Sequence, residues 1–167
     1  GYPVDSVVCV KARGMKDDKG QPTLQKVVLG PKGNGHGIGF GDINGDGRED
    51  ILVGSGWYER PAANPLGTEW KYHPDWDFHA SCPMLVADLD GDGRNDFIWG
   101  NGHDYGLFWI RQLEPAPDGT TKWERHEIDK SWSQVHCLHW ADLDGDGQPE
   151  VITGKRVRAH DKGDPGA

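Results

Sequence analysis

Long apolar runs, cysteine pairs and helical periodicity are what this 167-residue sequence lacks. No stretch approaches the roughly 18 consecutive apolar residues of a membrane-spanning helix, and the first residues show no signal-peptide pattern. Three cysteines, Cys9, Cys82 and Cys137, are an odd number and too few for a disulfide scaffold. No long segment repeats its apolar residues at the period of an amphipathic helix. The sequence therefore predicts neither a membrane span, nor a disulfide-rich domain, nor a helical bundle.

Glycine, tryptophan and acidic residues are abundant instead. The sequence has 25 glycines, 8 tryptophans and a formal charge of −9. Short β-branched or aromatic runs alternate with glycine-rich turns, a pattern typical of an all-β protein. A chain this acidic is a poor partner for nucleic acid, so no nucleic-acid ligand is expected.

The most informative pattern is an acidic nine-residue loop that occurs three times, at residues 42–50, 88–96 and 142–150. The first residues of the loops lie 46 and 54 positions apart, which indicates a repeat architecture. A short apolar run ending in glycine follows each loop and predicts a strand. These runs are Ile51–Gly54, Phe97–Gly100 and Val151–Gly154.

Each loop carries the oxygen ligands that calcium prefers. Oxygen-bearing side chains stand at loop positions 1, 3, 5 and 9, and the backbone carbonyl at position 7 is expected to be a further ligand. Glycines at positions 4 and 6 allow the chain to curl around an ion. The sequence thus predicts about three calcium sites. Their ligands are Asp42, Asn44, Asp46, Arg48 and Asp50; Asp88, Asp90, Asp92, Arg94 and Asp96; and Asp142, Asp144, Asp146, Gln148 and Glu150.

An EF-hand is the obvious alternative for such loops, but it requires a glutamate at position 12 on an exiting helix. Position 12 is Val53, Trp99 or Thr153 here, and each lies in a predicted strand. Simple acidic turns are the other alternative, and three copies with four side-chain oxygens each argue against it. Glu150 is longer than the aspartate at the same position of the other loops, and we expect it to weaken the third site.

The similarity between the copies extends beyond the loops. We predict units at about 24–69, 70–122 and 123–167, the last incomplete, with 1–23 supplying strands of a preceding unit. Each unit is expected to begin with an outer strand, followed by an inner strand, the acidic loop and two more strands. Four-stranded units of about 45–55 residues match the blades of a β-propeller. The expected inner strands are Gly37–Gly41, Pro83–Ala87 and Cys137–Ala141.

The pattern Asp-x-Asp/Asn-Gly-Asp-Gly-x-x-Asp/Glu, followed by apolar residues and glycine, resembles the FG-GAP (VCBS) repeat. This family includes the head of the integrin α-subunit and many bacterial extracellular proteins. The resemblance implies a β-propeller with calcium in the turns that join the first and second strands of each blade. Together with the calcium loops, it leads us to expect an extracellular or periplasmic protein.

The number of blades raises a question, because propellers close with about 4–8 blades. The predicted units within 1–167 cannot close a ring. Either further blades come from a longer parent protein or several chains associate into one ring, and we favour the former.

A second group of residues recurs six positions before each loop: His36, Cys82 and His136. Equivalent positions in successive blades surround one central channel, and imidazole and thiolate ligands suit zinc or another transition metal. The alternatives are a ligand pocket without metal, or ordinary residues at the start of a strand.

A ligand face is predicted at the end of the blades opposite the calcium loops. The turns expected between second and third strands, together with the connection before Cys82, bring aromatic, acidic and cationic side chains to this face. Such side chains suit a polar or anionic sugar. The predicted residues are Trp57, Tyr58, His79, His103, Asp104, Arg156, Arg158 and His160.

Two functions follow from these features. The first is a binding module for a carbohydrate or a protein, with calcium in a structural role. The second is an enzyme, because His36–Asp42, Gly56–Glu59 and Trp123–His126 resemble the propeller of bacterial relatives of aldos-2-ulose dehydratase. That resemblance implies a carbon–oxygen lyase, in which a metal polarises a carbonyl and His136 or His103 abstracts the adjacent proton.

Overall fold

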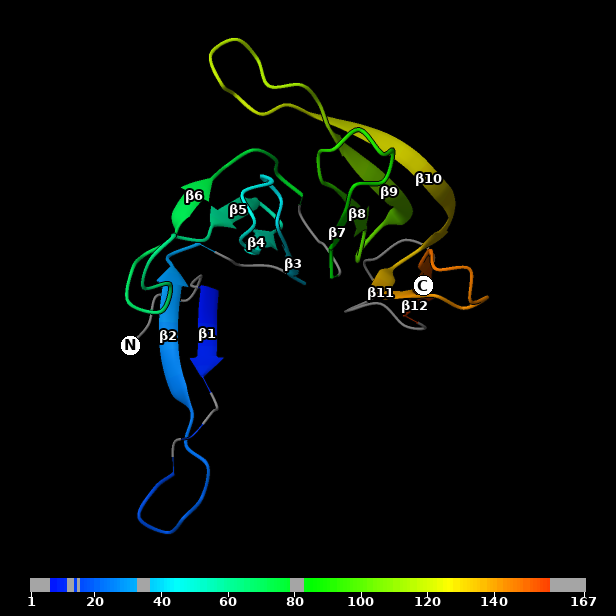
Figure 1. The fold of residues 1–167 in the computed structure, drawn as a ribbon. Helices are drawn as coiled ribbons and strands as arrows, with labels where there is room; N and C mark the ends of the chain where they lie inside the picture. The colour runs from blue at the N-terminus through cyan, green and yellow to red at the C-terminus, as the bar shows by residue number, and fades with distance from the viewer. Residues whose placement is uncertain (1–6, 12–13, 15, 33–36, 79–82, 157–167) are drawn as a thin grey trace.

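The fold consists of antiparallel β-sheets that follow one another around an arc (Figure 1). The computed structural model describes residues 7–11, 14, 16–32, 37–78 and 83–156. These residues form two four-stranded and two two-stranded sheets, and they include no helix that could cross a membrane. The prediction of an all-β protein made of incomplete propeller blades is confirmed.

Two complete blades lie in the middle of the chain. In each, the strands pair in the order in which they occur in the sequence, so the first strand is the innermost and the fourth the outermost. The first blade contains β3 (Gly39–Gly41), β4 (Asp50–Val53), β5 (Gly56–Glu59) and β6 (Lys71–His73). The second contains β7 (Leu85–Ala87), β8 (Asp96–Gly100), β9 (Tyr105–Gln112) and β10 (Trp123–Ser133).

Half-blades stand at the two ends of the described chain. One pairs β1 (Val7–Lys11) with β2 (Gln25–Gly30), and the other pairs β11 (Val135–Ala141) with β12 (Glu150–Lys155). The third acidic loop joins β11 to β12, which makes them the first and second strands of a blade. β2 precedes the first blade as β6 precedes the second, so β1 and β2 correspond to third and fourth strands.

The register of the two complete blades is the same where their outer strands pair. Trp57 lies opposite His73, and Trp109 lies opposite His126. The rings stack in both pairs, with centroids 4.0 Å and 4.7 Å apart. The two histidines therefore pack from the outer strands against tryptophans of the neighbouring strands.

The predicted unit boundaries differ from the observed blades. β6 and β10, predicted to open a unit, pair instead with β5 and β9 of the preceding one. The complete sheets consequently extend over residues 39–73 and 85–133. The physical reason is that an outer strand completes the hydrogen bonding of the strand just before it, whereas the next inner strand starts a new sheet.

Apolar clusters fill the spaces between successive sheets. Glycines on β3 allow it to approach β7 closely: a Cβ on Gly41 would lie 2.6 Å from that of Val86. The cluster between the first half-blade and the first blade contains Val7, Leu29, Ile51, Val53, Tyr58 and Trp70. The cluster between the two blades contains Ile43, Leu52, Trp57, Trp76, Met84, Phe97, Trp99, Phe108 and Ile110. The last contains Ile98, Leu107, Val135 and Leu138.

Candidate functional site

The three acidic loops connect the first and second strands of their sheets, as predicted. Their glycines at positions 4 and 6 all have positive φ, between 75° and 88°. This left-handed conformation is inexpensive only for glycine, so the tight curl of each loop depends on it. The glycines are Gly45, Gly47, Gly91, Gly93, Gly145 and Gly147.

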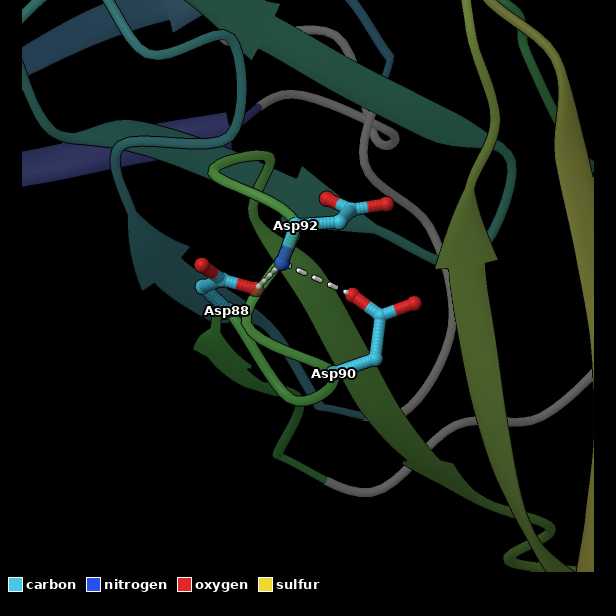
Figure 2. A group of neighbouring side chains, drawn as sticks. All are labelled: Asp88, Asp90 and Asp92. Atoms are coloured by element: carbon cyan, nitrogen blue, oxygen red, sulfur yellow. Dashed lines mark hydrogen bonds between the residues drawn. The ribbon is translucent and has the colours of Figure 1, made fainter.

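The second loop shows how the curl gathers its carboxylates (Figure 2). The backbone N–H of Asp92 donates to Oδ1 of Asp88 at 3.1 Å and to Oδ1 of Asp90 at 3.2 Å. The N–H of Gly93 donates to Oδ2 of Asp88 at 2.9 Å. One oxygen from each of the three aspartates lies within 4.8 Å of the others. Three carboxylates held this close without a cation repel one another, which suits an oxygen-seeking divalent ion.

The other two loops repeat this geometry. The position-1 carboxylates accept from the glycine at position 6, Asp42 from Gly47 at 2.8 Å and Asp142 from Gly147 at 3.0 Å. The acidic side chains of the third loop also converge within 4.8 Å. The first loop differs because Asn44 replaces an aspartate and contributes a neutral oxygen.

The carboxylates at position 9 lie deeper than those at positions 1, 3 and 5. Asp50 and Asp96 are fully buried. Asp50 accepts from the N–H groups of Ile43 at 3.2 Å and Arg60 at 2.8 Å. Burial raises the pKa of Asp50 to about 6, and Asp46 and Asp42 add to the rise. Each carboxylate oxygen has two lone pairs, so these bonds leave capacity for an ion.

In the third loop, the longer Glu150 reaches the equivalent backbone donor. Its Oε2 accepts from the N–H of Leu143 at 2.6 Å. The glutamate thus makes the same contact to loop position 2 as Asp50 and Asp96 do. Whether it weakens an ion site stays a prediction.

Arginine side chains contact the loops, a feature that the sequence patterns did not reveal. Arg94 Nε donates to the carbonyl of Gln112 at 3.4 Å, and its guanidinium contacts Asp92. Arg111, on β9, places Nη2 2.6 Å from Oδ2 of Asp90. These cations offset part of the loop's negative charge. Only the cross-strand position of Arg111 brings it there, and no local motif could have indicated it.

At the opposite end of the blades, three of the predicted face residues and His136 of the predicted channel site gather around Gln134. The rings of His103 and His136 stack with centroids 6.0 Å apart and an angle of 13°. The carbonyl of Asp104 accepts from the N–H of Gln134 at 3.0 Å. The guanidinium of Arg156 lies 3.4 Å from Oε1 of Gln134. Gln134 is buried and was not predicted.

The remaining residues of the predicted ligand face and of the predicted channel metal site include several that the structure does not describe. His36, His79, Cys82, Arg158 and His160 lie outside the described residues. The transition-metal site of His36, Cys82 and His136 therefore stays a prediction.

The prediction that Trp57 and Tyr58 present an open ligand face is wrong. Both lie within β5 rather than in a turn, and they are 4 % and 0 % exposed. The turn that joins β4 to β5 is only Gly54 and Ser55, so it carries no aromatic side chain. Tyr58 instead bonds to the backbone of Lys32, donating to its carbonyl at 2.6 Å.

A polar cavity of about 380 Å³ lies beside the first loop, between the first blade and the β9–β10 connection. His73 Nε2 and Glu59 Oε2 lie 2.9 Å apart in its wall. This hydrogen bond and the nearby Lys71 lower the pKa of Glu59. The cavity unites segments distant in the sequence, which is why sequence patterns missed it. Its lining residues are Asn44, Trp57, Glu59, Lys71, His73, Asp75, Gly119, Thr120 and Thr121.

Comparisons with known proteins agree with the loop geometry. A family model described as FG-GAP repeat matches residues 34–65, and a second, described as FG-GAP-like repeat, matches residues 88–153. Searches of curated proteins and of solved structures found no match, so the resemblance to aldos-2-ulose dehydratase relatives gains no support. The matched segments contain all three acidic loops, and the first also contains the inner strand β3. This chain therefore carries FG-GAP repeats, which fold as incomplete β-propeller blades.

Proposed function

We propose that this chain is a calcium-binding propeller segment that recognises a carbohydrate outside the cytoplasm. The observation that carries the calcium part is the common geometry of the three loops. In each, the oxygen ligands accept from the backbone N–H groups at loop positions 5, 6 and 7. In two of them, three carboxylates converge within 4.8 Å. Open loops of this kind bind calcium well at the concentrations outside cells, about 10⁻⁴–10⁻³ M.

Calcium titration of the chelator-treated chain tests this part of the proposal. We expect about three ions per chain, and Asp90→Ala should remove about one, because Asp90 belongs to a single loop. Asp118→Ala is the matched control, since Asp118 is an exposed acid in the β9–β10 connection that accepts only from its own turn. Equal binding by wild type and Asp90→Ala would contradict the assignment.

The carbohydrate part of the proposal is supported by the polar cavity beside the first loop. Glu59, His73 and Lys71 offer charged and neutral hydrogen-bonding groups there, and Thr120 and Thr121 offer hydroxyls. Sugar hydroxyls both donate and accept, so a wall with groups of both kinds suits them. Asn44 lies in the wall and also in the first calcium loop, which couples sugar binding to calcium.

Binding to an array of immobilised glycans tests the cavity. We expect Glu59→Gln to lose at least tenfold in affinity for any glycan that the wild type retains, and chelation of calcium to weaken binding as well. Glu124→Gln is the control, because Glu124 lies 3.0 Å from His126 in a similar pair away from the cavity. A glycan held equally by both variants would place the site elsewhere.

A sugar lyase is the second candidate, and the stacked His103–His136 pair favours it. One of these imidazoles would take the proton beside a carbonyl, and Arg156 would neutralise developing negative charge. His136→Ala should abolish elimination from a keto sugar, followed by the ultraviolet absorption of the conjugated product. His139→Ala, on the same strand, should retain it. Equal rates for the two variants would end this candidacy.

A further inference from the structure

Arg111, on the third strand of the second blade, reaches across to the second acidic loop. Its Nη2 lies 2.6 Å from Oδ2 of Asp90 and 3.3 Å from Oδ2 of Asp92. Both aspartates belong to the group of three whose oxygens converge within 4.8 Å. The guanidinium therefore contacts two of the carboxylates that a calcium ion in this loop needs.

The first blade has the opposite charge at the same position. The buried carboxylate at loop position 9 identifies the equivalent residues, because it accepts the N–H of Arg60 in the first blade and of Gln112 in the second, both at 2.8 Å. The residues just before these donors are Glu59 and Arg111. Glutamate and arginine thus occupy one structural position in the two blades.

Loop position 3 differs between the two blades in the matching way. The neutral Asn44 lines the polar cavity together with Glu59, whereas the charged Asp90 contacts Arg111. The arginine at loop position 7 does not create this difference, because in both loops it contacts the aspartate at position 5. The loop with the additional carboxylate is therefore the one that receives a cation from the third strand.

The guanidinium of Arg111 is attached to the loop through one nitrogen. Nη2 is shared between two carboxylates, instead of joining Nε in the two parallel bonds of a bidentate pair. Nε is buried and has no hydrogen-bond partner among the described residues. The side chain is 33 % exposed, so water can replace its contacts. Such an attachment is released more easily than a bidentate one.

We propose that Arg111 is an internal counter-ion that sets the calcium affinity of the second loop, an inference that rests on the proposed calcium function. Without calcium, its guanidinium neutralises Asp90 and Asp92 and thereby stabilises the curled loop. With calcium, Arg111 has to release these two carboxylates or share them with an ion of like charge, and either lowers the affinity. The residue thus stabilises the loop without an ion and weakens ion binding.

Calcium titration of a chain that keeps only the second loop, through Asp46→Ala and Asp144→Ala, tests the proposal. We expect Arg111→Gln to raise the calcium affinity about tenfold, because the charge around the ion is one determinant of affinity. Arg111→Lys should keep the lower affinity, since it keeps the charge. Arg125→Gln is the matched control: it makes the same change in charge on β10, where the guanidinium lies 5.1 Å from the centroid of the Phe108 ring.

Thermal unfolding of the chain with all three loops intact gives a second readout, which does not depend on the loop substitutions. In chelator, Arg111→Gln should lower Tm, because the converging carboxylates lose their counter-ion. At the same calcium concentration, the gain in Tm should then be larger than in the wild type, since a tighter site stabilises the fold more. A side chain that only packs would lower Tm equally with and without calcium, and that result would contradict the proposal.

The calcium function and the role of Arg111 fail in different ways. If the chain with only the second loop binds no calcium, the proposed function and this inference both fail. If it binds calcium, unchanged or weaker binding after Arg111→Gln would overturn the role of Arg111 alone. An equal gain after Arg125→Gln would assign the effect to net charge rather than to the contact with Asp90 and Asp92, and would also overturn it.

Discussion

The side chain at loop position 9 both holds the loop closed and favours a bound ion. Asp50 and Asp96 are fully buried and accept backbone N–H groups from the loop and from the third strand of the blade. Burial also raises the pKa of both carboxyls. A buried carboxylate is costly without a cation, so the residues that hold the loop closed also favour a bound ion.

The raised pKa of Asp50 predicts a pH dependence for the first site. Its pKa in the metal-free fold, about 6, exceeds the ordinary 3.8. The proton therefore stabilises the metal-free fold at low pH, and this contribution is lost as the pH rises through about 6. Protons and calcium compete for the same carboxyl, so calcium affinity should fall up to about tenfold per pH unit below about pH 6.

Calcium titration between pH 5 and pH 8 of a variant that keeps only the first loop, with Asp90→Ala and Asp144→Ala, measures this dependence. Affinity should be level at the upper end and decline below about pH 6. A flat profile down to pH 5 would show that Asp50 does not bind the ion.

A second prediction concerns Tyr58, whose buried hydroxyl donates to the carbonyl of Lys32 and accepts its N–H at 2.8 Å. Tyr58→Phe leaves both backbone groups without this partner and should lower the free energy of unfolding by about 1–3 kcal/mol. Urea denaturation measures the loss. Tyr105→Phe, at an exposed position, should change stability by less than about 0.5 kcal/mol.

At the scale of the element, the loops differ in charge although their backbones are alike. The first has Asn44 where the others have aspartates, and ligand charge is one determinant of calcium affinity. Asn44→Asp should therefore strengthen the first site by about tenfold in the single-loop variant. Asn95→Asp, at loop position 8 and outside the predicted ligand set, should not strengthen the second site. Titration calorimetry distinguishes the two, and an equal gain in both would indicate a general charge effect.

At the scale of the whole molecule, the acidic loops join the first and second strands of three successive sheets, so binding of the proposed ions should stabilise the fold as a unit. At an ion concentration one hundred times Kd, each site contributes about 2.7 kcal/mol. Removing calcium should lower Tm by several degrees per site, because about 1 kcal/mol shifts Tm by about 2–4 °C in a domain of this size. Calorimetry with and without chelator measures the shift, and an unchanged Tm would contradict a structural role for calcium.

The sequence by itself determined the acidic loops, their glycines and the short strands on either side. These features are local: a nine-residue loop carries its own ligands and its own left-handed glycines, and the apolar run after it has the length and composition of a strand.

Only the tertiary structure decided how these pieces combine. Pairing assigned β6 and β10 to the preceding sheets. Packing buried Trp57 and Tyr58, which had been placed on a ligand face because they were expected in a turn. The gathering of His103, Asp104, His136 and Arg156 around Gln134 depends on contacts between segments up to 53 residues apart. Local chemistry is encoded within a few neighbouring residues, whereas burial and contacts across strands arise only once separate strands share a sheet.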